Sequence, residues 1–353
     1  MTLYIGVDLH PHQQTAAWCD TRTGETETVD LKHDIGKVRE FYEGLSEPAI
    51  VGIEASSKMN WFENMLTDTG HKLFVGNPVL IRKRATSRHK NDRRDAELIL
   101  DLLMRDEFPA IWRRPQTSNQ VIEIMGMRKS LVRQRIQCYN RLQALAHSIG
   151  MPKSHMKTAR AQAVLKAAEM SEADLIRREH LFLLIEQLSG QIASLEEWLK
   201  KKAEENSSVQ LLQTQSGVGY LTALVTVHTL GEVTRFKKVN KAVVSFAGLD
   251  PREMSSAGRV RFGAITKAGS SMLRHHLGQA VMTATRYDPS LKAFYKRLAK
   301  KKPKAVAKTA ASRKLLVKLA IMLRDSITAE EFDQRGRTVG NARKIAGSEM
   351  TAT

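Results

Sequence analysis

The sequence predicts an α/β N-terminal domain, a helical, coiled-coil-like middle segment and a mostly α-helical C-terminal domain. Three observations support this fold class. Short apolar runs alternate with helix-like stretches over the first hundred residues, long glycine-poor helical sequence follows, and a second glycine-containing region begins near Val209. We therefore expect domains at 1–110, 118–203 and 209–330, followed by a tail at 331–353.

The N-terminal domain is predicted to hold five strands and two helices. Short apolar segments bounded by Gly, Pro, Asn or Ser are typical of strands. The five such segments are Leu3–Val7, Gln14–Cys19, Thr26–Leu31, Ala49–Ala55 and Lys72–Gly76. Apolar residues at helical intervals predict helices at Lys58–Thr69 and Asn91–Met104. This alternation favours a sheet covered by helices.

The middle segment carries a seam of apolar residues that is typical of a helix packed on another helix. The seam residues are Leu181, Leu184, Leu188, Ile192, Leu195 and Leu199. Their partner is either the earlier stretch Val121–Leu145 of the same chain or a second copy of the chain. The sequence leaves both alternatives open.

The C-terminal domain begins with a glycine-containing turn, Ser216-Gly217-Val218-Gly219, before an apolar helix-like run. A Gly-x-Gly turn of this kind either points backbone N–H groups at a phosphate or is simply a tight turn. Farther along, Phe246–Pro251 is interpreted as the end of a helix or strand that enters a turn. The Gly- and Ser-rich stretch Arg252–Gly269 is then expected to be an ordered loop.

The chain is strongly basic, with 56 Lys and Arg against 37 Asp and Glu, a net charge of +19. From Pro251 to Thr353 there are 22 Lys and Arg against 7 Asp and Glu, so this segment carries +15 of that charge. Such a balance indicates a polyanionic partner, either nucleic acid or an acidic membrane surface. The densest run, Lys296–Lys308, is interpreted as a non-specific contact to a nucleic-acid backbone or as a flexible basic arm.

The cysteines and the apolar segments exclude several classes of protein. Cys19 and Cys138 are far apart and lack a partnered spacing, which supports neither a disulfide framework nor a cysteine zinc site. The N-terminus has no basic leader with a long apolar run, and no segment approaches the roughly 20 apolar residues of a membrane span. We therefore expect a cytoplasmic protein without a membrane partner.

Four carboxylates occupy positions that could converge on one site. Asp8 lies at the end of the first predicted strand and Glu54 at the end of the fourth, while Asp92 and Asp95 are three residues apart on a predicted helix. Residues i and i+3 share a helix face, and strand ends of an α/β sheet commonly gather ligands. Such oxygen ligands suit Mg²⁺ or Mn²⁺ in phosphoryl transfer.

The four carboxylates differ in how strongly they indicate function. Asp8 and Glu54 stand in apolar strands, where an unpaired carboxylate is costly, so a functional role is favoured. Asp92 and Asp95 have neighbouring basic residues, which would also explain them as a solvated, salt-bridged helix end.

Several of these segments together resemble one family. GVDLH, GIEAS, the Asn77-Pro78 pair and KNDRRDAELI resemble the N-terminal domain of the insertion-sequence one-ten transposases, also called DEDD transposases. Ser216–Gly219, Phe246–Pro251 and REMSSAGRVRFGAITKAGSSMLR resemble that family's C-terminal domain, in the same order. The resemblance implies a RuvC-like RNase H fold in which Asp8, Glu54, Asp92 and Asp95 form the metal-binding tetrad.

The resemblance also implies a serine nucleophile. The family's serine lies in a Ser-Gly step after a Gly-Leu-x-Pro segment, and Ser256 matches it, five residues after Pro251. Here the chain has Ala257 where glycine is usual, and Ser255 is an adjacent alternative. From the residues alone, a serine in such a loop is most often only a loop residue.

Basic residues surround the serine loop and are candidate phosphate contacts. They are Arg259, Arg261, Lys267 and Arg274. Alternation along a strand would place Arg259 and Arg261 on one face. The alternative is an ordinary basic surface.

The resemblance implies a mobile-element transposase that cuts and rejoins donor and target DNA through a covalent phosphoserine intermediate. It further implies a homo-oligomer, a dimer or tetramer, whose active site combines domains of different subunits, and a non-coding bridge RNA that selects the DNA. Two alternatives stay open: an RNase H-like nuclease that hydrolyses branched DNA with metal-activated water, and a non-enzymatic basic nucleic-acid-binding protein.

Overall fold

The computed structural model describes residues 3–56, 59–85, 91–152, 155–254 and 261–336. The chain divides into two compact units, residues 1–113 and residues 114–353.

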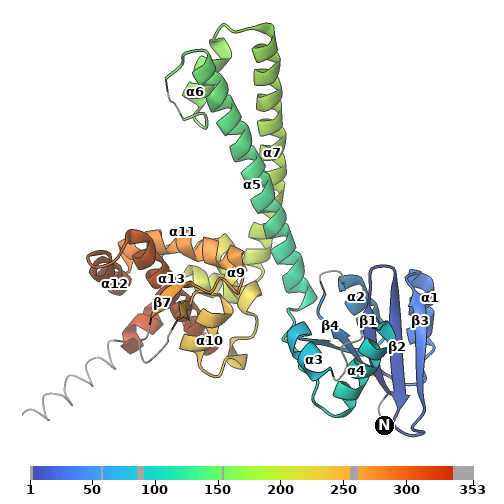
Figure 1. Cartoon of the computed structure of the whole chain (residues 1–353). Coiled ribbons are helices and arrows are strands. Elements are labelled where there is room, and N and C mark those ends of the chain that lie inside the picture. The colour runs from blue at the N-terminus through green and yellow to red at the C-terminus, as the bar shows by residue number, and fades with distance from the viewer. Residues whose placement is uncertain (1–2, 57–58, 86–90, 153–154, 255–260, 337–353) are drawn as a thin grey trace, which may run out of the picture. The chain divides into compact units, whose positions relative to one another are not determined.

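The first unit contains a five-stranded mixed sheet with the strand order β3-β2-β1-β4-β5 (Figure 1). The strands are β1 (Leu3–Leu9), β2 (Gln13–Asp20), β3 (Thr26–Lys32), β4 (Ala49–Glu54) and β5 (Lys72–Gly76). β1, β2 and β3 form an antiparallel meander, whereas β4 is parallel to both β1 and β5. The predicted α/β class is confirmed, and each predicted strand is present with ends that differ by at most a few residues.

Two helices cover one face of this sheet. α1 (Ile35–Glu43) buries Val38 and Tyr42, and α2 (Asn60–Asp68) buries Phe62 and Leu66. These side chains pack with Ile5, Val7, Val51 and Ile53 of the two central strands in one apolar cluster. The odd-numbered residues of β1 therefore face α1 and α2, because side chains alternate along a strand.

The opposite face of the sheet is covered by α4 (Asp92–Met104), which contacts β1, β2 and β4. α4 approaches the sheet closely because β1 and β4 carry glycine at the contact. A Cβ atom on Gly6 would lie 2.2 Å from the carbonyl oxygen of Ala96, and one on Gly52 would lie 2.7 Å from Leu103 Cδ1. The short α3 (Pro78–Arg84) adds Ile81 to the apolar cluster under α4.

The second unit contains a long helical hairpin of α5 (Gln116–Ser148) and α7 (Glu172–Glu204), with α6 (Ala159–Ala167) between them in sequence (Figure 1). Across the hairpin, Arg128 Nε lies 2.7 Å from Glu196 Oε1 and Arg135 Nη1 donates to Ser189 Oγ at 3.1 Å. The apolar seam of α7 therefore has an intrachain partner.

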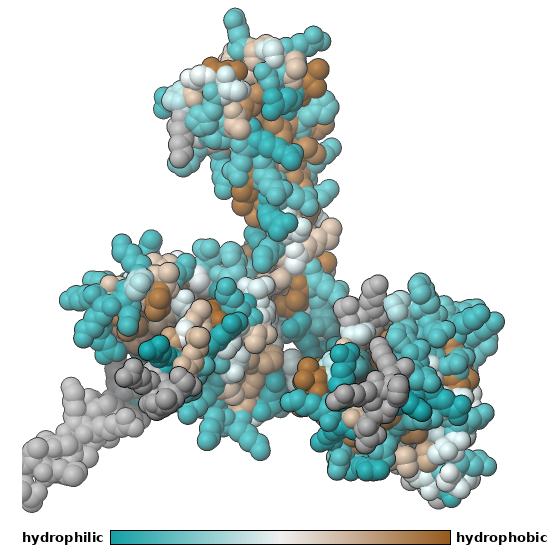
Figure 2. Space-filling view, viewed as in Figure 1, coloured by the Kyte–Doolittle hydropathy of each residue, from teal (hydrophilic) through white to brown (hydrophobic). Residues whose placement is uncertain are grey.

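One member of the predicted seam is wrong. The Leu184 side chain is 43% exposed, whereas Ile185 beside it is 7% exposed and packs with Leu142 and Leu181. Both residues are apolar, so their spacing alone does not decide which of them meets α5. Figure 2 shows apolar surface along this hairpin. Leu183 and Leu184 are among the exposed apolar residues of α7.

The remaining helices of the second unit share one apolar core. They are α8 (Ser207–Gln213), α9 (Tyr220–Leu230), the 3-10 turn η1 (Val233–Arg235), α10 (Val239–Phe246), α11 (Ser271–Tyr287), α12 (Pro289–Ala299) and α13 (Lys304–Asp325). α12 and α13 contain most of the basic run Lys296–Lys308, so its described conformation is helical and not that of a flexible arm. Within the tail that was expected from residue 331, the structure describes residues 331–336, which are helical.

Two glycine-containing segments of the second unit have defined conformations. Gly217 has a φ of +87°, and a Cβ atom there would lie 2.5 Å from the Ala284 nitrogen. A close turn packed on α11 thus accounts for this glycine. The expected loop Arg252–Gly269 instead includes a two-stranded hairpin, β6 (Pro251–Glu253) with β7 (Phe262–Ile265).

Among the described residues, none of the helices combines the length and the apolar character that a membrane crossing needs.

Candidate metal centre

The sheet brings Asp8 and Glu54 to the same edge. β1 and β4 are parallel, and their register ends with Val7 opposite Ile53. The next residues of the two strands are Asp8 and Glu54. Alternation places both residues on the face of Gly6 and Gly52, which is the face that α4 covers.

The first turn of α4 carries Asp92 and Asp95 to this face. Asn91 caps the helix by accepting a hydrogen bond from the Arg93 N–H at 3.2 Å. The positive end of the helix dipole stabilises acidic residues in the first turn of a helix, and it therefore favours Asp92 and Asp95 at these positions. The neighbouring Arg93 forms an ion pair with Glu97 at 3.2 Å. Arg93 therefore does not form the salt bridge to Asp92 or Asp95 that a purely solvated helix end would contain.

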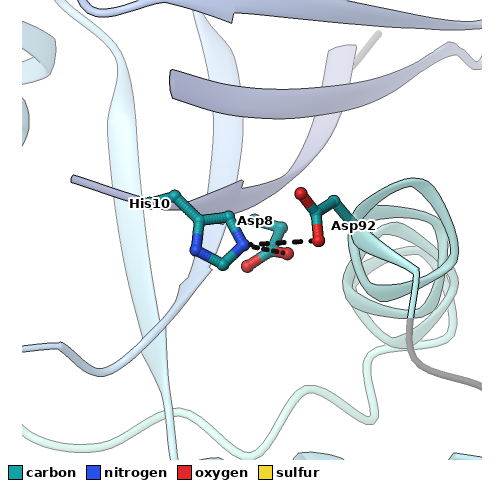
Figure 3. A group of neighbouring side chains, drawn as sticks. All are labelled: Asp8, His10 and Asp92. Atoms are coloured by element: carbon teal, nitrogen blue, oxygen red, sulfur yellow. Dashed lines mark hydrogen bonds and ion pairs between the residues drawn. The ribbon is translucent and has the colours of Figure 1, made fainter. Parts of the chain in front are cut away.

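Three side chains meet at this position, as Figure 3 shows: Asp8, His10 and Asp92. His10 Nε2 lies 3.1 Å from Asp8 Oδ2 and 3.4 Å from Asp92 Oδ1. One ligand atom from each residue lies within 4.8 Å of the other two. The two carboxylates, Asp8 and Asp92, are therefore close enough to share one cation.

The electrostatics of the cluster bear on whether a cation fits. Burial raises the pKa of the Asp8 carboxyl, the charge of His10 lowers it, and the charges of Asp95 and Asp92 raise it again. Asp95 is therefore near enough to Asp8 to act on it. Because burial and two like charges oppose ionisation of Asp8, a divalent cation among these carboxylates would relieve an unfavourable arrangement. The donor set of carboxylate oxygens fits a hard cation such as Mg²⁺ or Mn²⁺.

Glu54 contacts an arginine and not the other carboxylates' histidine. Its Oε1 lies 3.7 Å from Arg82 Nη2 of α3, and its side chain is 34% exposed. It shares the edge and the face of Asp8 but does not belong to the group of three within 4.8 Å. The structure thus brings Asp8 and Asp92 together with His10. Asp95 acts on Asp8 through its charge, and Glu54 contacts Arg82; neither belongs to this group of three.

His10 was not predicted as a site residue. It follows Asp8 by two positions, and alternation on a strand places residues i and i+2 on one face. The GVDLH segment therefore contained a usable signal for His10. Arg82 could not be found this way, because its contact to Glu54 depends on how α3 packs.

The predicted serine nucleophile falls outside the described part of the chain. Ser256, the alternative Ser255 and the predicted phosphate contact Arg259 all lie in the segment 255–260. Arg261 immediately precedes β7 and is exposed, and its carbonyl accepts a hydrogen bond from the Met254 N–H at 2.8 Å.

The other two predicted phosphate contacts have distinct surroundings. Lys267 is exposed and has a φ of +57° at the turn before α11. Arg274 Nη1 donates to the carbonyl oxygens of Ala247 at 2.9 Å and Gly269 at 2.6 Å. Arg274 therefore ties the α10 end to the α11 start, a structural role that its sequence position did not reveal.

Comparison with known proteins gives matches over both units. The family model for DEDD transposases of the IS110 type, described as "Transposase", matches residues 5–151, and the model described as "Transposase IS116/IS110/IS902 family" matches residues 209–296. The two matches follow one another in the order expected from the resemblance.

Curated relatives carry related names. A putative transposase of Sinorhizobium fredii is 29% identical over 233 residues, which is 64% of this chain and 59% of the relative. A probable family 20 transposase of Pseudomonas aeruginosa is 24% identical, over 67% of this chain and 71% of the relative. The transposase for insertion sequence element IS1328 of Yersinia enterocolitica is 26% identical, over 66% and 70%.

Proposed function

Because this chain belongs to the IS116/IS110/IS902 family of transposases, we propose that it is a DNA transposase that cuts and rejoins DNA strands. The observation that carries the proposal is the meeting of Asp8 and Asp92 at the sheet edge, with Asp95 close enough to act on Asp8. A family match alone would leave open whether this chain retains a metal-binding site. The converging carboxylates supply the ligands that metal-dependent DNA cleavage needs.

The fold in this proposal is the RuvC-like RNase H fold. The mixed sheet with order β3-β2-β1-β4-β5 supports it, as do carboxylates at the ends of two central parallel strands and at the start of a helix. The glycine contacts of β1 and β4 with α4 hold these three elements at a fixed spacing.

Asp8, Asp92 and Asp95 are proposed to hold Mg²⁺ or Mn²⁺, with Glu54 as the fourth ligand. When bound, such a cation polarises a scissile phosphate and stabilises the charge that develops on its oxygens. His10 contacts both Asp8 and Asp92 and so fixes the orientation of their carboxylates. To bind the cation, the Glu54 carboxylate would give up its contact with Arg82.

Ser256 is proposed as the nucleophile, on the basis of the family resemblance. Its Oγ forms a bond to phosphorus, the bond from phosphorus to one deoxyribose oxygen breaks, and that oxygen takes a proton while the serine proton passes to a base. Attack by a strand hydroxyl on the phosphoserine reverses these changes and rejoins DNA. The phosphodiester energy is thereby kept in the covalent link.

The partners in this proposal are donor and target DNA, a bridge RNA and a second copy of the chain. The charge of +15 on the segment from Pro251 supports a polyanionic partner. Exposed Leu183 and Leu184 on α7 support a helix contact to another copy in a homo-oligomer. The bridge RNA rests on the family resemblance alone.

Trapping of the covalent intermediate tests the proposal. The full chain is incubated with radiolabelled element-end DNA and Mg²⁺, and protein-bound label is measured after denaturation. We expect an adduct that Ser256→Ala abolishes and the matched Ser255→Ala retains. Cleavage that persists in Ser256→Ala without any adduct would instead support a nuclease that hydrolyses DNA with activated water.

The third function, non-enzymatic binding of nucleic acid, makes a different prediction. It requires that Asp8→Asn leave every effect of the protein on DNA unchanged while added salt abolishes binding. Loss of cleavage with retained DNA binding in Asp8→Asn excludes it.

A further inference from the structure

A pocket in the second unit lies where three helix ends meet. It has a volume of about 430 Å³ and is lined by Arg114, Thr229, Ser245, Phe246, Ala268, Gly269 and Ser270. These residues come from the start of the unit, the end of α9, the end of α10 and the approach to α11. One water occupies roughly 30 Å³ of liquid, so the pocket has room for a phosphate group and part of its sugar.

The charges around the pocket favour an anion. α11 is 17 residues long, and Ser270 caps it by accepting from the Leu273 N–H at 3.2 Å. The N–H groups at the first positions of a helix have no intrahelical acceptor and carry the positive end of the dipole. Arg114 adds a full positive charge, and none of the seven lining residues is acidic.

A second, independent observation concerns Thr229. Its side chain is 2% exposed, and in the described part of the chain its hydroxyl Oγ1 has no hydrogen-bond partner. A buried hydroxyl without a partner is costly, so such a group in a native fold calls for an explanation. Thr229 lines the pocket, and a bound phosphate oxygen would accept its hydrogen bond.

Asp250 is an acidic residue close to the pocket, because it contacts the lining residue Ser245. Asp250 accepts a hydrogen bond from Thr266 Oγ1 at 2.7 Å and from Ser245 Oγ at 3.4 Å. Asp250 does not line the pocket. Its carboxylate oxygens are therefore occupied by the hydroxyls of Thr266 and Ser245.

We propose that this pocket binds one phosphate group of the DNA backbone, held by the Thr229 hydroxyl, the Arg114 guanidinium and the first N–H groups of α11. The assignment to DNA rests on the function proposed above, whereas the phosphate chemistry rests on the pocket itself. The site differs from the basic side chains around the serine loop, because it includes a buried hydroxyl, that of Thr229, and the start of a helix.

The variant Thr229→Val tests the pocket, and Thr226→Val is its matched control. Thr226 is also buried on α9, but its Oγ1 donates to the Thr222 carbonyl at 2.7 Å. Valine keeps the shape of threonine and removes the hydroxyl. Fluorescence anisotropy measures the affinity of each full-length variant for a DNA duplex and for an RNA duplex of the same sequence, over a series of salt concentrations.

We expect Thr229→Val to weaken DNA binding about tenfold, the effect of one hydrogen bond to a charged group, without changing the salt slope. Arg114→Gln should reduce that slope by about one, since one counterion fewer is released. Thr226→Val should bind as the wild type does. If Thr229→Val weakens binding to the RNA duplex and not to the DNA duplex, the assignment of the phosphate to DNA is wrong.

Thermal unfolding with inorganic phosphate gives a readout that is independent of DNA. We expect phosphate to raise the Tm of Thr226→Val more than that of Thr229→Val, at equal ionic strength set with chloride. If phosphate raises the Tm of both variants equally, and both variants bind DNA with equal affinity, the proposed phosphate site is wrong. Such a result would leave the proposed transposase function intact, because that function is judged by Asp8→Asn and the serine adduct.

Discussion

Asp8 and Asp92, which lie far apart in the sequence, meet at one imidazole nitrogen: His10 Nε2 is 3.1 Å from Asp8 Oδ2 and 3.4 Å from Asp92 Oδ1. The contact joins the end of β1 to the first turn of α4. It therefore makes the proposed metal centre dependent on how closely that helix packs on the sheet.

The first prediction concerns cation binding. Asp92→Asn should abolish the rise in Tm that Mn²⁺ gives to the wild-type chain, because a ligand that binds only the folded state stabilises it by mass action. The matched control is Asp101→Asn on the same helix. Asp101 Oδ1 lies 2.8 Å from Arg105 Nε, and Asp101 does not belong to the cluster. An undiminished Mn²⁺ shift in Asp92→Asn would remove this residue from the site.

Strand cleavage gives the second prediction. A bound cation contributes several kcal/mol to stabilising the transition state, so Asp8→Asn should slow DNA cleavage by at least about a hundredfold. Single-turnover cleavage of element-end DNA measures this rate, and anisotropy checks that DNA is still bound. If Asp8→Asn cleaves at the wild-type rate, the site does not perform the chemistry.

His10 is expected to act as a positioning residue for the two carboxylates. His10→Ala should lower the affinity for Mn²⁺ by about 10–100-fold, the usual cost of losing a group that orients metal ligands. His12→Ala is the control, because His12 is exposed in the same turn. Added Mn²⁺ should restore cleavage in His10→Ala, and a rate that stays low at saturating Mn²⁺ would argue against a positioning role.

Much of the first unit was predictable because its apolar segments are distinct. β1, β2, β4 and α4 follow from local patterns, since each buries several apolar side chains. α1 and α3 were missed because α1 buries Val38 and Tyr42 alone among its described side chains, and α3 buries only Ile81. With so few buried positions, a short helix produces little periodic signal.

The site was predictable only in part, for a related reason. Strand ends and helix spacing identified the four carboxylates, but not which of them meet. That outcome depends on the depth at which α4 packs, which Gly6 and Gly52 permit. The contacts of Glu54 with Arg82 and of Arg274 with two carbonyls likewise arise from tertiary packing, which no local pattern encodes.

Gly6 gives the next prediction, because its missing side chain sets the position of α4. Gly6→Ala should destabilise the first unit by about 1–3 kcal/mol or more, since the new Cβ would lie 2.2 Å from the Ala96 carbonyl oxygen. It should also weaken Mn²⁺ binding by moving Asp92. Tryptophan fluorescence in urea and the Mn²⁺-dependent Tm measure the two effects.

Gly190→Ala is the control for this substitution. Gly190 lies within α7, and no atom lies within 4 Å of the Cβ position there. Alanine at that position should stabilise the helix by about 0.5–1 kcal/mol. If Gly6→Ala is as harmless as Gly190→Ala, the close approach of α4 does not position the site.

The last prediction concerns the acid stability of the second unit. Burial raises the pKa of the Asp288 carboxyl, but the Leu291 N–H, the Lys318 charge and the Ser290 hydroxyl outweigh burial and leave the pKa below the ordinary 3.8. Above pH 3.8 the carboxylate is ionised in both folded and unfolded chains, so its stabilisation is fully present. As the pH falls through the lowered pKa, this stabilisation is lost.

Asp288→Asn isolates the charge, because asparagine still caps α12 by accepting from the Leu291 N–H. We expect it to lower the free energy of unfolding at neutral pH by on the order of 1.5–3 kcal/mol, since it removes a charged hydrogen bond to the buried Lys318. Urea unfolding followed by far-ultraviolet circular dichroism should show this deficit shrinking below pH 3.8. Glu204→Gln, on the exposed surface of α7, should change little. A deficit that persists at full size in acid would mean that the shape of Asp288, and not its charge, stabilises the fold.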